Sequence, residues 1–131
     1  IPLMIKVACA IIEHEGKVLC AQRSSKMHLP NKWEFPGGKV KEETLEECLT
    51  REIKEELGVE IIILEQLPSN EHSYPGSKKI QLIPFRCSLQ TFKIMLLEHS
   101  QAGWFPIEKL KSLDWAEADI PIVNYYINKY K

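Results

Sequence analysis

Residues 44–58 carry the pattern that most constrains the fold of this chain. Every fourth side chain from 45 to 57 is apolar, at Leu45, Leu49, Ile53 and Leu57. This spacing puts the four side chains on one face of an α-helix, and Gly58 stands just past the last of them, where helices commonly end. We therefore predict a helix from about Thr44 to Leu57 that packs one face against a core.

Strands are predicted on both sides of this helix. β-Branched and apolar runs occupy residues 5–12, 17–21, 33–35, 59–64, 79–89 and 92–97. Glu15-Gly16 predicts a tight turn between the first two runs, and Pro84 predicts an edge strand or a bulge. A second helix is expected from Pro121 to Tyr130, because proline favours the first helical turn. Elements in this order predict a mixed α/β domain.

Length and charge exclude several classes of protein. The chain has 131 residues, with 17 basic and 18 acidic side chains and a net charge of −1. This length supports one domain, residues 1–131, and residues 1–3 before Met4 are interpreted as a cloning remnant. The near-neutral balance argues against direct nucleic-acid binding. Without an apolar run of roughly 20 residues or a signal pattern, we expect a cytoplasmic protein with no membrane partner and four buried, unpaired cysteines.

The predicted helix is also strongly acidic. Seven of the 18 acidic residues lie between Glu42 and Glu56. At about 3.6 residues per turn, Glu52 and Glu56 fall in the same arc as the apolar face, where a solvated acidic surface would not place them. Clustered carboxylates repel one another unless a cation lies between them, and Mg²⁺ and Mn²⁺ are natural partners of such oxygens. The pattern predicts metal-assisted chemistry on a phosphate ester or anhydride.

The same stretch is similar to the signature of the Nudix hydrolases. The match is Gly37-x5-Glu43-x7-Arg51-Glu52-Ile53-x-Glu55-Glu56-x-Gly58-Val59. Only four residues separate Gly38 from Glu43, so the signature begins at Gly37 and the glycine loop is one residue shorter than is usual in MutT-like members. The resemblance implies the Nudix fold, a mixed β-sheet sandwiched between helices. It also implies an enzyme that hydrolyses a nucleoside triphosphate to the monophosphate and pyrophosphate.

The resemblance further implies a role for each matched residue. The metal, Mg²⁺ with Mn²⁺ as a possible substitute, is expected at Gly37, Glu52, Glu55, Glu56 and Glu98. Arg51 is expected to orient Glu52 through a charge-assisted hydrogen bond. Either Glu52 or Glu98 is expected to activate the attacking water. The expected partners are therefore a nucleoside triphosphate and water.

Substrate contacts are implied at Arg23, His28, Phe35, Tyr74 and Asp119. The leading interpretation is removal of oxidised nucleotides such as 8-oxo-dGTP. Asp119 favours an alternative, a cytidine-type pyrophosphohydrolase, because an ionised carboxylate accepts hydrogen bonds from an amino group, whereas a protonated Asp119 suits 8-oxoguanine. Three further alternatives are Asp119 as the N-cap of the last helix, Phe35 as a core aromatic, and a non-catalytic nucleotide-binding module.

Overall fold

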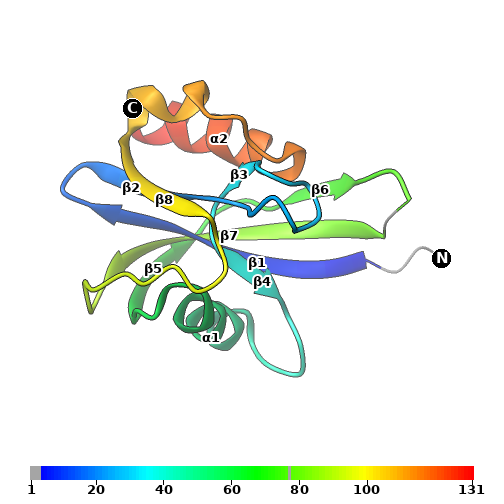
Figure 1. Ribbon diagram of the computed structural model, residues 1–131, viewed down its shortest axis with the longest axis horizontal. Coiled ribbons are helices and arrows are strands. Elements are labelled where there is room, and N and C mark those ends of the chain that lie inside the picture. The colour runs from blue at the N-terminus through cyan, green and yellow to red at the C-terminus, as the bar shows by residue number, and fades with distance from the viewer. Residues whose placement is uncertain (1–3, 77) are drawn as a thin grey trace.

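The computed structural model describes residues 4–76 and 78–131, so the cloning remnant predicted at residues 1–3 lies outside the described part of the chain. Helix α2 covers one face of a β-sheet and α1 covers the other, which confirms the predicted mixed sheet between helices (Figure 1). The elements are β1 (Met4–His14), β2 (Lys17–Gln22), β3 (Trp33–Glu34), β4 (Gly37–Lys39), α1 (Leu45–Leu57), β5 (Ile61–Gln66), β6 (Asn70–Ser73), β7 (Lys79–Leu89), β8 (Gln101–Pro106), two 3₁₀ turns (Ile107–Ser112 and Glu117–Asp119) and α2 (Ile120–Tyr130).

Strand β1 lies at the centre of the sheet and is buried on both faces. It pairs in parallel with β7 and antiparallel with β2 and β4. Its side chains alternate between the faces, as the pleat of a strand requires. Ala8, Ala10 and Ile12 belong to the core under α1, whereas Cys9 and Ile11 belong to the core under α2. One strand therefore separates the two cores.

Helix α1 is capped at both ends by hydrogen bonds to its terminal backbone groups. The Thr44 hydroxyl accepts the Glu47 N–H at 3.1 Å, and the Glu47 carboxylate accepts the Thr44 N–H at 2.9 Å. This reciprocal pair satisfies two donors that the first turn of a helix leaves unpaired. Gly58 ends the helix in the left-handed conformation. The predicted helix is confirmed, as is the predicted helix at the end of the chain.

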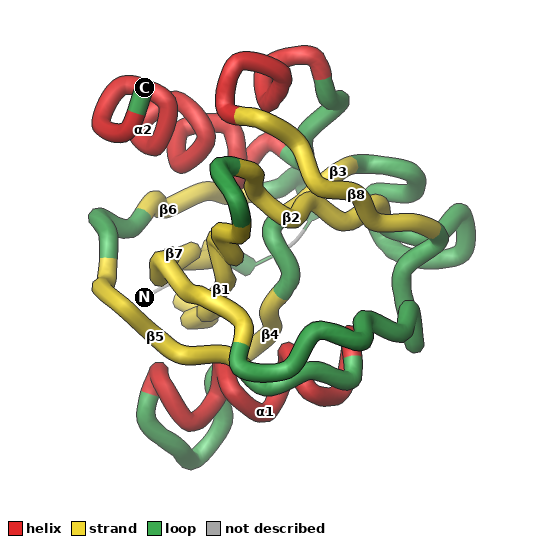
Figure 2. The backbone as a smooth tube through the Cα atoms, turned by 90° about the vertical axis from the view of Figure 1, so that its left-hand side faces the viewer, coloured by secondary structure: helices red, strands yellow, loops and turns green. Residues whose placement is uncertain are grey.

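The strand predicted at residues 92–97 is wrong, because this segment is part of a loop that runs beside α1 (Figure 2). Met95 and Leu97 donate their N–H groups to the carbonyl oxygens of Leu57 and Glu56, at 2.9 and 3.0 Å. Those carbonyls belong to the last turn of α1, which has no partners of its own for them. The loop therefore satisfies the helix end instead of a neighbouring strand. The next strand forms later, as β8 against β2.

Three further features of the sheet differ from the prediction. Strands β4 and β6 were not expected, and β4 forms although it begins with Gly37-Gly38, a pair that by itself favours a turn. Pro84 lies within β7, which has partners on both sides, so the predicted edge strand is wrong. Pro84 lies opposite the residues that separate β5 from β6. The register shift described between β5 and β7 lies elsewhere, at Ile63–Glu65 of β5.

The four cysteines are free and buried, as predicted from their spacing. Burial raises the pKa of each thiol, so none of them is a reactive thiolate. Among the described residues, no helix combines the length and the apolar character needed to cross a membrane.

Candidate active site

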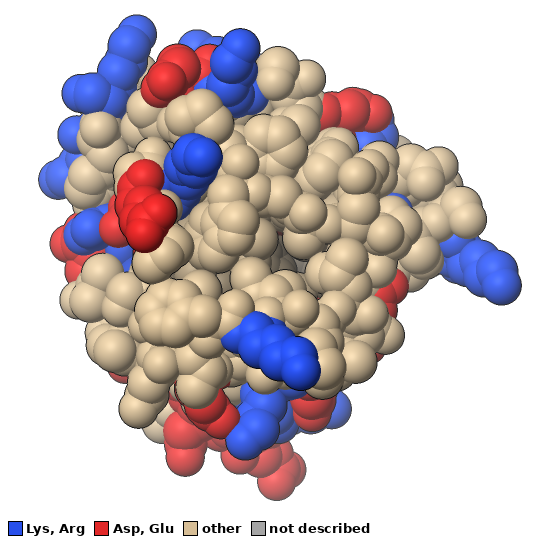
Figure 3. Space-filling model, turned by 60° about the vertical axis from the view of Figure 1, so that its left-hand side comes forward, with Lys and Arg blue, Asp and Glu red and all other residues tan. Residues whose placement is uncertain are grey.

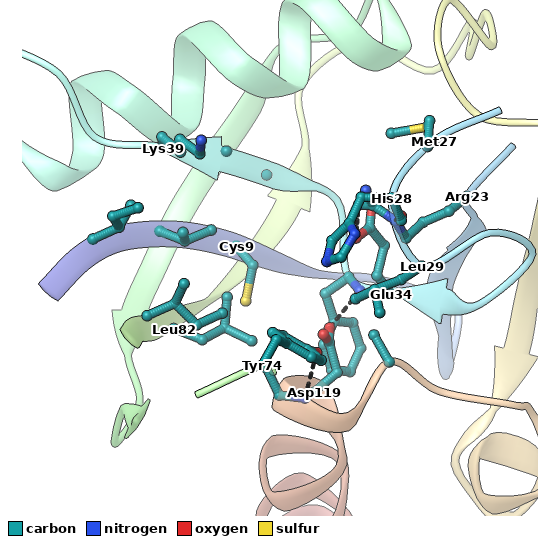
Figure 4. Close-up of a pocket in the computed structure, with 18 of the residues that line it drawn as sticks. Cys9, Arg23, Met27, His28, Leu29, Glu34, Lys39, Tyr74, Leu82 and Asp119 are labelled. Atoms are coloured by element: carbon teal, nitrogen blue, oxygen red, sulfur yellow. Dashed lines mark hydrogen bonds and ion pairs between the residues drawn. The ribbon is translucent and has the colours of Figure 1, made fainter. Parts of the chain in front are cut away.

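A cavity of about 580 Å³ opens between α1, the sheet and the segment that precedes α2. Its walls include nine of the residues predicted for the site, namely Arg23, His28, Phe35, Gly37, Glu52, Glu56, Tyr74, Glu98 and Asp119. In Figure 4, Tyr74 and Asp119 lie at one end, Lys39 lies toward another, and Arg23, His28 and Glu34 lie along one side. Segments that are distant in sequence thus converge on one pocket.

One end of the cavity is acidic and is built by α1 and β4. The Gly37 N–H donates to Glu56 Oε1 at 2.9 Å, which fixes that carboxylate against the sheet. The carboxylate of Glu52 lies directly over Gly38, where a Cβ atom would stand only 2.3 Å from Oε2. The two glycines therefore leave space and a donor for the two carboxylates. Strand β4 thus lies against the helix through both glycines.

Arg51 stands behind the cavity and orders the carboxylates around it. Its Nη1 lies 2.8 Å from Glu52 Oε1 and 3.3 Å from Glu55 Oε2. Its Nε and Nη2 bind both oxygens of Glu43, at 3.0 and 2.7 Å. The hydrogen bonds from Arg51 lower the pKa of Glu43 to about 2. The structure therefore places Arg51 within hydrogen-bond distance of Glu52, and its orienting role stays a prediction.

Glu55 is the predicted metal ligand that lies farthest from the cavity. Its side chain is 56% exposed and contacts Arg51, and neither residue lines the cavity. The outward face of α1 also carries Glu46 and Glu47. Acidic side chains gather along the lower edge of the molecule in Figure 3, on the side where α1 lies. Glu55 thus belongs to the rim and Glu52 and Glu56 to the interior.

Glu56 is buried, at 4% exposure, among other acids. Burial, followed by the charges of Glu34, Glu98 and Glu52, raises the pKa of Glu56 to about 9. A carboxylate in such surroundings is costly unless a cation is nearby. Hard oxygen donors that face one cavity are the ligands that Mg²⁺ or Mn²⁺ prefers. The donor set therefore fits a divalent cation.

Two polar residues at this end were missed by the sequence analysis. Glu34 accepts from Arg23 Nη1 at 2.8 Å and lies 2.8 Å from His99 Nε2. His99 is fully buried and also lies 3.9 Å from Glu56. Glu34 lies in a short strand whose polar and apolar residues alternate, and His99 directly follows Glu98. Neither position in the sequence predicts that the two side chains lie in contact. Only the fold brings them together.

The opposite end of the cavity surrounds Asp119. Its Oδ2 accepts the Phe35 N–H at 3.0 Å, and the Tyr74 hydroxyl accepts the neighbouring Ala118 N–H at 2.9 Å. The Phe35 ring packs on Trp115 at 4.8 Å, so its side chain belongs to the core while its backbone holds Asp119. Asp119 occupies the N-cap position of α2, as one alternative predicted, but its side chain makes no capping hydrogen bond and instead accepts the Phe35 N–H.

Asp119 is buried, at 5% exposure. Burial, followed by the charge of Glu34, raises the pKa of Asp119 well above its usual range, although the Phe35 N–H and Arg23 oppose the shift. A neutral carboxyl group both donates and accepts hydrogen bonds. Arg23, also predicted to contact substrate, is held by Glu34 and by the His28 carbonyl oxygen at 2.6 Å. Asp119 gives this end of the cavity its polar character, whereas Arg23 and Glu34 lie along one side of the cavity (Figure 4).

Comparison with known proteins points to one family. A sequence model of the NUDIX domain matches residues 2–126. The CTP pyrophosphohydrolase of Escherichia coli K12 is 34% identical over 125 residues, which cover 95% of this chain and 92% of the relative. The putative 8-oxo-dGTP diphosphatase 2 of Mycobacterium tuberculosis H37Rv is 32% identical, covering 88% and 82%. The solution structure of MutT from methicillin-resistant Staphylococcus aureus 252 is 42% identical, with a TM-score of 0.79 and coverage of 98% and 99%.

Proposed function

Because this chain belongs to the NUDIX family of hydrolases, we propose that it converts a nucleoside triphosphate to the monophosphate and pyrophosphate in a Mg²⁺-dependent reaction, with 8-oxo-dGTP as a preferred substrate. Hydrolases of this family act on nucleotides and generally use divalent metals. The observation that carries the proposal is that one cavity has carboxylates at one end and the buried Asp119 at the other. This arrangement suits a ligand with a phosphate chain and a base.

At the acidic end, the proposed metal ligands are Glu52, Glu56 and Glu98, with Glu55 at the rim. The bound ion would neutralise phosphate charge and lower the pKa of a coordinated water. Arg51 holds the Glu52 carboxylate, and the Gly37 N–H holds Glu56. Glu52 or Glu98 accepts the proton of the attacking water. Arg23 faces the substrate from the opposite wall.

At the base end, the neutral form of Asp119 supports the choice of 8-oxoguanine. Its Oδ2 already accepts the Phe35 N–H, so a proton on the other oxygen gives one donor for the base. Tyr74 bonds to the neighbouring Ala118, and the His28 ring lies 6.1 Å from the Tyr74 ring. A protonated carboxyl group thus offers the same pair of functions as an amide. The base sits between these groups in the proposal.

The experiment is a nucleotide panel with Mg²⁺, comparing kcat/KM for 8-oxo-dGTP, dGTP, dCTP, CTP and 5-methyl-dCTP, with products identified by chromatography. We expect 8-oxo-dGTP to lead the cytidine nucleotides by at least about tenfold, or about 1.4 kcal/mol. A tenfold preference for cytidine nucleotides would contradict the choice of base. Metal binding without turnover of any nucleotide would favour a non-catalytic module.

Variants at residue 119 sharpen this test. Asp119→Asn keeps one donor and one acceptor, so it should retain 8-oxo-dGTP turnover within about threefold, whereas Asp119→Ala should lose about 100-fold. In the wild type, kcat/KM for 8-oxo-dGTP should fall as the pH rises through the raised pKa of Asp119, because the donor proton is lost. The asparagine variant should lack this fall. A shared pH profile would refute the role of the proton.

A cytidine nucleotide is the second candidate. The acidic side chain at position 119 favours it, since an ionised carboxylate accepts from the cytosine amino group. The relative named CTP pyrophosphohydrolase also matches nearly the whole chain. In that case Asp119→Asn should reduce turnover of dCTP and CTP more than that of 8-oxo-dGTP.

A further inference from the structure

His99 is a buried polar residue that the proposed function leaves without a role. Its side chain is fully buried, although it lies in the loop between β7 and β8. Nε2 lies 2.8 Å from Glu34 Oε2 and 3.9 Å from Glu56 Oε2, while Nδ1 finds no hydrogen-bond partner among the described residues. An imidazole buried with one nitrogen unpaired costs free energy that an apolar residue would not. This cost indicates a use other than packing.

Apolar burial holds the loop around His99 only at Ile94, which packs against the core under α1. The four large apolar side chains around Ile94 are 41–59% exposed, at Phe92, Met95, Leu96 and Leu97. Near the site, the backbone of Leu97 bonds to Glu56 in α1, and that of Ser100 bonds to Gln22 in β2, each at 3.0 Å. Glu98 and His99 lie between these two anchors. The His99 side chain is therefore a third attachment, directly beside Glu98.

The partner of His99 is itself fixed from the other side. Arg23 Nη1 lies 2.8 Å from Glu34 Oε1, and Arg23 Nε donates to the His28 carbonyl oxygen at 2.6 Å. Glu34 thus stands between the wall that carries Arg23 and the loop that carries Glu98. The hydrogen bond between His99 and Glu34 therefore connects the two walls, and Glu56 lies next to it.

We propose that His99 is a positioning residue whose Nε2, bonded to Glu34, holds the Glu98 loop so that Glu98 and Glu56 face one divalent ion. The proposal rests on the proposed function, because it assumes that these two carboxylates bind metal. Direct coordination by the imidazole is the competing arrangement, since one atom from each of Glu34, Glu56 and His99 lies within 4.8 Å of the others. The short contact to Glu34 favours positioning, because it occupies Nε2, and Arg23 already neutralises Glu34.

The test uses His99→Gln and His99→Asn in the full chain. The glutamine amide nitrogen reaches about as far as Nε2, whereas the asparagine amide reaches only the position of Nδ1. Mn²⁺ affinity is measured by electron paramagnetic resonance without nucleotide, and thermal unfolding checks the fold. We expect His99→Asn to weaken Mn²⁺ binding at least about tenfold and His99→Gln to stay within about threefold of the wild type. The Mn²⁺ concentration needed for half-maximal turnover should rise in parallel with the loss of affinity. The KM for nucleotide should change less.

Controls separate this proposal from the function on which it rests. His72→Asn alters another histidine that lies beside a carboxylate, Glu117 at 3.2 Å, and should keep wild-type Mn²⁺ affinity. Glu56→Gln should weaken Mn²⁺ binding strongly; if it does not, the proposed metal site fails. If Glu56→Gln weakens binding while His99→Asn is folded and binds Mn²⁺ normally, only the positioning role is refuted. Equal losses in the asparagine and glutamine variants would also refute it, as would ¹⁴N modulation from a coordinated imidazole in the Mn²⁺ spectrum.

Discussion

Replacing Gly38 by alanine is predicted to disable the site without unfolding the protein. A Cβ atom at this position would lie 2.2 Å from Cδ of Glu52, whereas ordinary contacts begin near 3.4 Å. The Glu52 carboxylate must therefore retreat by about 1 Å, which a flexible side chain can do at small cost to stability. Misplacing a reacting group by that distance costs about 100-fold in rate, or about 2.7 kcal/mol of transition-state stabilisation.

Gly37→Ala is the matched comparison for this prediction. At residue 37 the added Cβ would lie 2.0 Å from the carbonyl oxygen of Ala8, in the backbone of β1. That strand is central and cannot retreat, so this variant should lose stability, by roughly 1–3 kcal/mol. The two neighbouring substitutions should therefore have different effects. Gly38→Ala should lower kcat at nearly constant stability, and Gly37→Ala should lower the melting temperature.

The assay is pyrophosphate release at saturating Mg²⁺ and nucleotide, combined with thermal unfolding followed by circular dichroism. The expected result for Gly38→Ala is a loss in kcat of about two orders of magnitude and a change in melting temperature of a few degrees at most. A folded Gly38→Ala variant with wild-type kcat would show that the position of Glu52 over Gly38 does not matter for the reaction.

Two further predictions concern the carboxylates themselves. Glu52→Gln should lower kcat by orders of magnitude with the fold intact, and steady-state kinetics showing near-full activity would remove Glu52 from the reaction. Glu56 has a folded pKa of about 9 against about 4.3 in an unfolded chain, so between these values the unfolded state loses its proton first. The free energy of unfolding of the metal-free protein should therefore fall as the pH rises through this window. Urea unfolding of Glu56→Gln should lack this fall and show greater stability than the wild type at pH 8; equal pH slopes would contradict the burial argument.

Helix α1 was predictable from the sequence because its signals are local. The fourth-residue spacing, the cap at Gly58 and the acids of the signature all lie within one segment. Strand β4 was not, because glycine favours a turn and this strand exists only through pairing with β1. The segment 92–97 was predicted as a strand from its apolar composition, yet its N–H groups bond to the end of α1. Which partner satisfies a backbone group is a tertiary property.

The same distinction divides the residues of the site. Glu52 and Glu56 could be placed on the inner face of α1 by counting turns. The burial of Asp119, and hence its raised pKa, depends on the segment before α2 packing over Phe35. Glu34 and His99 are 65 residues apart, and no periodicity links them. Local pattern therefore predicted the carboxylates of α1 and the candidate Asp119, while the burial of Asp119 and the pairing of Glu34 with His99 required the fold.

The alternation along β1 gives a rule for redesigning the specificity of this protein. Ile5, Val7 and Cys9 line the cavity, whereas Ala8 and Ala10 pack under the helix that bears the carboxylates. A library that varies only the odd-numbered positions from 5 to 9 of β1 would reshape the pocket and leave the residues packed under α1 unchanged. A library at the even-numbered positions would disturb the helix first. Under the proposed function, specificity for a new base can therefore change on one face of a single strand while the face under α1 is conserved.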